Sequence, residues 1–212
     1  MSNMYKELSE YIDISKYGKE IFSGSQSIII DTNENKNMYL ILTKEIEKKE
    51  YLTNISHTYG FDIIDTDILS ELKDEGYYSF LMSKLDSIES DLFNDYSPLS
   101  IAFSEYLKFG SNYILPELMD IDNIINNIWD KRKLIYEESR EGLSDLEVEL
   151  ISCFDKEQED FEFDILESAR YSLEVIKKMS DSIDSEILVD LHFDQFKLFN
   201  NKIVCIDPVL FN

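Results

Sequence analysis

The last 26 residues of the chain, ILVDLHFDQFKLFNNKIVCIDPVLFN (Ile187–Asn212), carry its most specific pattern. Asp190 opens an acidic loop, and two short strands separated by an Asn-Asn-Lys turn are predicted after it, at residues 196–199 and 203–206. The second strand ends at Asp207. The pattern therefore predicts a hairpin with one carboxylate at each rim.

Two carboxylates at the rims of a hairpin suit a metal-phosphate site. Hard cations prefer oxygen ligands, and a hairpin fixes the separation of the ligands better than a loop does. The alternative is that Asp190 and Asp207 simply bound a hairpin in a very acidic protein.

The order of residues in this stretch also resembles a known family. Asp-Leu-His, then two residues and a carboxamide, then a hairpin ending in Ile-Asp-Pro, is similar to the catalytic loop and metal-binding Asp of the kinase-like phosphotransferases. The resemblance is to the aminoglycoside phosphotransferases and the small kinase-like proteins of tailed bacteriophages in particular. It implies that Asp190 orients or deprotonates the acceptor hydroxyl and that Asp207 holds Mg²⁺. The family normally has Asn as the second metal contact, where this chain has the longer Gln195.

The first part of the chain contributes further candidates under the same resemblance. The turn at residues 23–27, with Gly24, occupies the place of the glycine-rich loop over the ATP phosphates; an ordinary hairpin turn is the alternative. Lys44 ends a strand predicted at residues 38–44, as the ATP-positioning lysine does in the family. Glu50 or Glu47, on a helix predicted at residues 45–59, is the implied partner of Lys44; a solvated helix face is the alternative.

Hydrophobic periodicity predicts an α+β chain with two parts. Residues 1–85 are expected to form a small β-rich lobe of about five antiparallel strands around one helix, including a hairpin that turns at Gly76 between residues 67–72 and 77–82. Residues 86–212 are expected to form a mainly helical lobe ending in the catalytic-loop-like hairpin at residues 187–208. Helices are predicted to begin at Ser97-Pro98, at Pro116, at Ser144 and near Phe161. The resemblance implies a protein-kinase-like two-lobed fold.

The net charge of the chain limits which partners it can bind. The chain has 44 acidic and 20 basic residues, a formal charge of −24, which argues against direct binding to nucleic acid and favours a basic partner. The acids at residues 137–138, 157–162 and 181–186 are expected on helix surfaces and ends. No run of 18 apolar residues and no signal-peptide pattern occur, so a cytoplasmic protein without membrane contact is expected.

Three functional hypotheses follow. The sequence continues for five residues after Asp207, so we expect no segment for the surface on which protein kinases bind peptides. We therefore expect a divergent kinase-like protein, with weak or no phosphotransferase activity, that binds a host or defence protein; residue usage rich in Asn, Lys, Ile, Asp and Tyr suits an AT-rich phage or its host. An active phosphotransferase that uses ATP and Mg²⁺ is one alternative. An acidic DNA mimic that inhibits a nucleic-acid-binding protein is the other.

Overall fold

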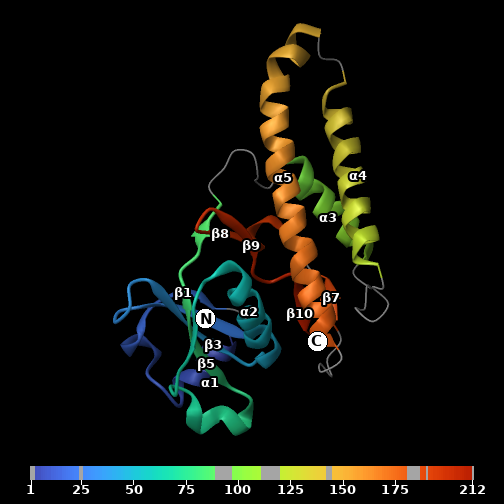
Figure 1. Ribbon diagram of the computed structural model, residues 1–212. Coiled ribbons are helices and arrows are strands. Elements are labelled where there is room, and N and C mark those ends of the chain that lie inside the picture. The colour runs from blue at the N-terminus through green and yellow to red at the C-terminus, as the bar shows by residue number, and fades with distance from the viewer. Residues whose placement is uncertain are drawn as a thin grey trace. The chain divides into compact units, whose positions relative to one another are not determined.

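The structure is a computed structural model, and it describes residues 3–23, 26–88, 97–110, 120–141, 145–180, 187–189 and 191–211. The chain forms two compact units, Met1–Leu85 and Asp86–Asn212 (Figure 1). Both units combine helices and antiparallel strands, so the expected α+β class is confirmed.

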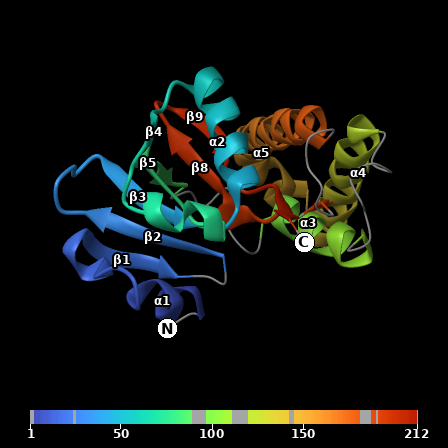
Figure 2. The ribbon, with the colours of Figure 1, turned by 90° about the horizontal axis from the view of Figure 1, so that it is seen from below.

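The first unit is built on a five-stranded antiparallel sheet, as the sequence predicted. Its spatial order is β1-β2-β3-β5-β4, which Figure 2 shows from below. The strands are β1 (Gly18–Ser23), β2 (Ser27–Thr32), β3 (Met38–Thr43), β4 (Ile63–Asp65) and β5 (Tyr78–Ser83).

One face of this sheet packs against the N-terminal helix α1 (Asn3–Ser9). Alternate residues of β2 and β3 point to this face, because successive side chains of a strand point to opposite sides. They form one buried cluster with apolar residues of α1; its members include Met4, Leu8, Ile28, Ile30, Leu40 and Leu42. Burial of these side chains fixes the register of the strands.

Helix α2 (Ile46–Tyr59) follows β3 and ends where the sequence predicted. Gly60 adopts a left-handed conformation, with φ of 84°, and its N–H donates to the Ser56 carbonyl at 2.7 Å. Glycine takes this conformation without the steric cost of a Cβ, and it therefore ends the helix.

The hairpin expected around Gly76 is wrong in its first arm. Residues Ser70–Glu75 form a 3-10 helix, η2, and β5 pairs with β3 and β4. Leu69 and Leu72 are both buried, and a spacing of three places two side chains on one side of a 3-10 helix. Gly76 does take a positive φ, 83°, but as the cap of η2.

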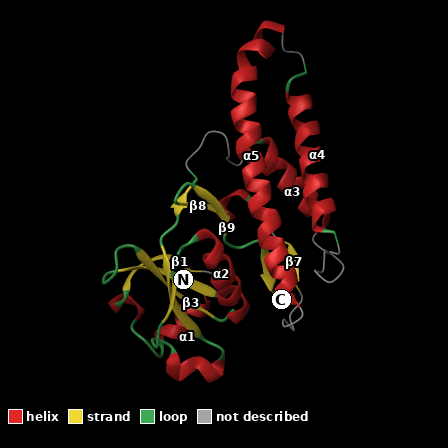
Figure 3. Ribbon diagram, in the orientation of Figure 1, coloured by secondary structure: helices red, strands yellow, loops and turns green. Residues whose placement is uncertain are grey.

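The described residues of the second unit include three long helices (Figure 3). Helix α3 (Pro98–Gly110) starts where predicted, and the Ser97 hydroxyl accepts from the Ser100 N–H at 3.3 Å as its cap. Helix α4 (Ile121–Ser139) is capped by Asp120, whose side chain accepts from Asn123 N–H at 3.0 Å. The start predicted at Pro116 lies outside the described residues.

Helix α5 (Asp145–Met179) corrects the sequence analysis. The two helices predicted from Ser144 and from Phe161 are one continuous helix of 35 residues. The segment contains neither Gly nor Pro, so no residue in it breaks the backbone hydrogen bonding. Among the described residues, no helix is long and apolar enough to cross a membrane.

Candidate functional site

The candidate catalytic segment, residues 190–207, lies in sequence between two short strands of the second unit that pair with each other. Strand β7 (Ile187–Val189) pairs antiparallel with β10 (Val209–Phe211), and Val189 lies opposite Val209. The pairing brings together the two ends of the segment between them. Asp207 lies two residues before β10, while Asp190, directly after β7, is outside the described residues.

Between these strands lies the predicted hairpin, which the structure confirms. Strand β8 (Phe196–Phe199) pairs with β9 (Lys202–Cys205), and β6 (Asp86–Ser87) joins β8 on its other side. Asn200 and Asn201 form the turn with φ of 50° and 60°. Two consecutive left-handed residues are the geometry of a type I′ turn, whose twist matches that of the strands.

Helix α5 and helix α3 hold the hairpin in place. Ser168 and Ser172, one turn apart on α5, contact the two polar groups of buried Cys205: the Cys205 N–H donates to Ser168 Oγ at 2.9 Å, and Ser172 Oγ donates to the Cys205 carbonyl at 3.5 Å. Phe103 of α3 stacks on Phe196 with ring centroids 5.8 Å apart. The strand that precedes Asp207 is therefore fixed by buried hydrogen bonds.

Gln195 closes the loop that precedes the hairpin. Its side-chain oxygen accepts from the His192 N–H at 3.3 Å, and its amide nitrogen lies 2.9 Å from His192 Nε2. Since the amide nitrogen is a donor, His192 Nε2 accepts, which leaves the proton on Nδ1, where the ring contacts Asp194. Both polar ends of the buried Gln195 side chain are thus engaged within the loop.

The backbone brings Gln195 close to Asp207. The N–H of Ile206, the residue before Asp207, donates to the Gln195 carbonyl at 2.9 Å. The half-buried Asp207 supplies one carboxylate at this point. Among the described residues, which exclude Asp190, no group of three or more His, Cys, Asp or Glu side chains gathers as metal ligands.

In the first unit, the candidate lysine contacts residues that the sequence analysis did not identify. Lys44 Nζ lies 2.6 Å from Glu7 Oε2 and 4.8 Å from the centre of the Tyr77 ring. The Tyr77 hydroxyl donates to the same Glu7 oxygen at 2.8 Å. The hydrogen bond with Lys44 lowers the pKa of Glu7, and the same bond raises the pKa of Lys44. Burial raises the pKa of the Tyr77 hydroxyl.

The remaining candidates of this unit do not join that cluster. Among the described residues, the carboxylate that contacts Lys44 is Glu7 of α1, and neither Glu50 nor Glu47 of α2 does so. Glu50 is exposed. Gly24 lies outside the described residues.

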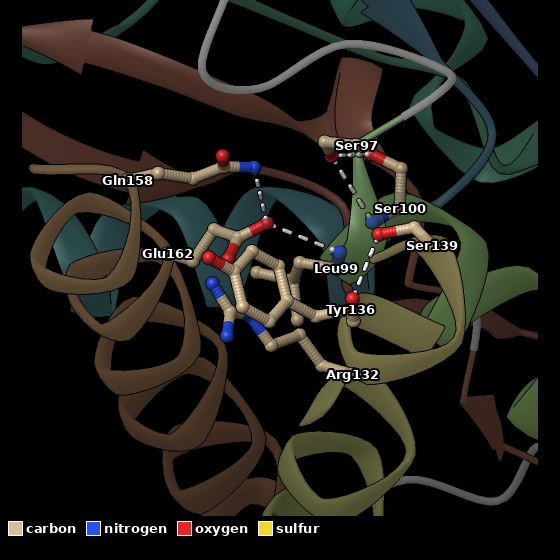
Figure 4. A network of polar contacts seen from close by, with 8 residues as sticks. All are labelled: Ser97, Leu99, Ser100, Arg132, Tyr136, Ser139, Gln158 and Glu162. Atoms are coloured by element: carbon tan, nitrogen blue, oxygen red, sulfur yellow. Dashed lines mark hydrogen bonds and ion pairs between the residues drawn. The ribbon is translucent and has the colours of Figure 1, made fainter. Parts of the chain in front are cut away.

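A buried ion pair in the second unit was also missed (Figure 4). Arg132 Nε of α4 donates to Glu162 Oε2 of α5 at 2.6 Å, and the other oxygen of Glu162 accepts from the Leu99 N–H at 3.1 Å. Leu99 is in the first turn of α3, so the carboxylate also faces the positive end of that helix. The sequence analysis counted Glu162 among surface acids, yet it is fully buried; no local pattern marks a partner 30 residues away.

Comparison with known proteins adds no relative, since the chain matches no protein family, no curated protein and no solved structure. The fold therefore defines the class of this chain: an α+β protein with a five-stranded antiparallel sheet and a helical unit. The helical unit carries a hairpin that lies, in sequence, between the paired strands β7 and β10.

Proposed function

We propose that the chain is a divergent kinase-like protein that transfers phosphate weakly or not at all and acts by binding another protein. The observation that carries this proposal is the order of elements in the second unit. The long helix α5 is followed by β7, the Asp190 loop, the hairpin β8-β9, Asp207 and β10, which returns to pair with β7. A catalytic loop and a metal-binding Asp in a kinase-like fold need this order. The five-stranded sheet of the first unit is the element expected of the small lobe.

Two contacts support the weak-activity part of the proposal. Phosphoryl transfer depends on positioning and on neutralising the developing charge. The charge of Lys44 is already countered by Glu7, a partner outside α2. The amide of Gln195, which replaces the family's metal-binding Asn, is bonded at both ends to His192.

Asp207 fits the remaining metal role. Mg²⁺ is usually held through one or two carboxylates together with substrate phosphates and water, so one half-buried carboxylate after a fixed strand suits it. Bound with ATP, the ion would neutralise phosphate charge, and Asp207 would hold it. Asp190 keeps its proposed place at the acceptor hydroxyl.

The partner we propose is a host or defence protein with a basic surface, met in the host cytoplasm by a phage-encoded chain. The charge of −24 supports this choice, since a strongly acidic protein is steered toward basic surfaces and away from nucleic acid and anionic membranes.

Calorimetry with Mg²⁺ and ATP tests the catalytic half. The full chain is compared with Asp190→Asn, Asp207→Asn and the control Asp164→Asn, which removes the same charge from an exposed position of α5. We expect no ATP binding tighter than about 1 mM and no ATP turnover above background. Tight binding, with turnover that both site variants abolish and the control retains, would establish an active phosphotransferase instead.

Affinity capture tests the binding half. The full chain is expected to retain a basic protein at low salt and to release it as ionic strength rises, equally in Asp190→Asn and Asp207→Asn. Competition by duplex DNA for a captured nucleic-acid-binding protein would favour the DNA-mimic function. Failure to capture any basic protein contradicts the proposal.

A further inference from the structure

A groove with a volume of about 610 Å³ runs along the C-terminal half of α4, where α5 contributes to its wall. One row of its lining is Arg132, Tyr136 and Arg140, spaced one helical turn apart. Both guanidinium groups lie against the Tyr136 ring, with Cζ at 4.9 Å for Arg132 and 5.1 Å for Arg140. Arg140 Nη1 also donates to the Tyr136 hydroxyl at 2.8 Å, and Arg132 is paired with buried Glu162. These cations are therefore engaged within the protein.

The carboxylates of the groove are in a different situation. Glu137 lies in the last turn of α4, Glu141 follows the end of that helix, and Glu159 faces the groove from α5. All three are exposed, and none makes a side-chain hydrogen bond or ion pair with another residue that the structure describes. Lys133 also lines the groove and is exposed, with its Nζ 5.6 Å from the Trp129 ring. The exposed charges of the lining are therefore three carboxylates and one lysine.

An aromatic pair adjoins the groove. Trp129 of α4 and Phe163 of α5 meet edge to face with centroids 6.2 Å apart, and Phe163 is 51% exposed. Arg132 Cζ lies 5.1 Å from the Trp129 ring, and Phe163 is one turn along α5 from Glu159, so the pair and the groove are continuous. Exposed aromatic side chains of this kind are common anchors of protein interfaces.

We propose that this surface, the groove together with Trp129 and Phe163 and hereafter the α4–α5 face, binds an arginine- or lysine-rich segment of another protein. The proposal rests on the proposed function and names the surface that would perform it. The cationic heads of the segment meet Glu137, Glu141 and Glu159, while their aliphatic stems and any apolar neighbours pack on Trp129 and Phe163. Charge complementarity selects this occupant, since the field of a chain with a charge of −24 attracts cations and repels anionic ligands.

The first experiment asks whether a basic segment binds at this face. The chain contains one tryptophan, Trp129, so its emission reports on this surface alone. The full chain is titrated with a synthetic arginine–leucine peptide and with a matched peptide in which glutamate replaces arginine. We expect a saturable change in emission with the basic peptide, weakened by salt, and none with the acidic one. A basic peptide that binds without changing the Trp129 emission, or an acidic peptide that binds equally well, would overturn the proposal.

The second experiment separates this surface from total charge. Anisotropy of the labelled basic peptide is measured for the triple variant Glu137→Gln, Glu141→Gln, Glu159→Gln. The control is Glu10→Gln, Glu34→Gln, Glu75→Gln, which removes the same charge from three exposed acids of the first unit. We expect Kd to rise about tenfold in the first and less than about twofold in the control. Equal losses in both variants would overturn the proposal.

A variant with unchanged net charge tests whether the aromatic side chains contribute to binding. Phe163→Ala removes an exposed anchor from the α4–α5 face, and we expect Kd for the same peptide to rise about fivefold with thermal unfolding changed little. An unchanged Kd would remove Trp129 and Phe163 from the proposed surface and overturn it in this form.

The captured partner distinguishes failure of this inference from failure of the proposed function. A basic protein that binds the Glu137, Glu141, Glu159 variant as tightly as the unaltered chain would overturn the α4–α5 face and leave the function standing. Selective peptide binding at the face, without any captured basic protein, would support the face while the function fails.

Discussion

Arg132 Nε donates to Glu162 Oε2 at 2.6 Å, with 4% of the arginine side chain and none of the glutamate side chain exposed. Through the further bond from Leu99 N–H, this carboxylate joins all three long helices of the second unit. Burial raises the pKa of Glu162, and the nearby guanidinium opposes that rise. The packing of α3, α4 and α5 therefore depends on the buried Glu162 carboxylate, whose charge is stabilised by the Arg132 guanidinium.

We predict that Glu162→Gln destabilises the protein by about 3 kcal/mol or more, because it leaves the Arg132 charge buried and uncompensated. Unfolding in urea measures the loss. The matched control is Glu159→Gln, an exposed acid three residues earlier on α5, which is expected to change stability by less than about 0.5 kcal/mol. Similar small effects of both substitutions would contradict the structural role of the pair.

The Lys44–Glu7 contact predicts a stability difference that depends on pH. Glu7 has a folded-state pKa below 4.5, so its contribution is present above that value and is lost as pH falls through the folded pKa. Lys44 has a folded-state pKa above 10.5, so its contribution is lost only as pH rises through that higher value. Lys44→Met is therefore expected to be less stable than the unaltered chain near neutral pH and equally stable in strong acid. Urea unfolding of both proteins at several pH values checks this prediction. If Lys44→Met remained less stable in strong acid, the stability loss would come from lost packing on Tyr77 and not from the ion pair.

Gln195→Ala is predicted to loosen the loop before the hairpin. The His192 N–H loses its acceptor, and a buried bond of this kind is worth about 1 kcal/mol. Hydrogen exchange at the His192 amide should accelerate, while Gln26→Ala, at an exposed position of the first unit, should leave it unchanged. Unaltered protection of this amide in Gln195→Ala would show that the side chain does not hold the loop.

The turn of the hairpin offers a test with two opposite substitutions. Asn201 has φ of 60°, a conformation that glycine adopts freely and valine avoids. Asn201→Gly is expected to be neutral or slightly stabilising, whereas Asn201→Val is expected to cost about 1–2 kcal/mol. Chemical denaturation compares them; equal stability of the two variants would mean that another turn forms.

Local patterns were sufficient where the determining contacts are close in sequence. The end of α2 at Gly60, the start of α3 at Ser97 and the hairpin with its Asn200-Asn201 turn were all predicted, because caps and turns act over a few residues. The same local reasoning misread residues 67–72 as a strand, since a short apolar run does not distinguish a strand from a 3-10 helix.

Tertiary structure decided the partners of the charged groups. Glu7 lies 37 residues from Lys44, and Glu162 lies 30 residues from Arg132, so neither pairing leaves a periodic signal in the chain. The sequence by itself determined the α+β class, the antiparallel sheet and the position of Asp207 after a strand. Only the folded chain decided that Lys44 meets Glu7, that Gln195 closes its own loop and that Glu162 is buried, because these outcomes depend on which helices and strands pack together rather than on neighbours along the chain.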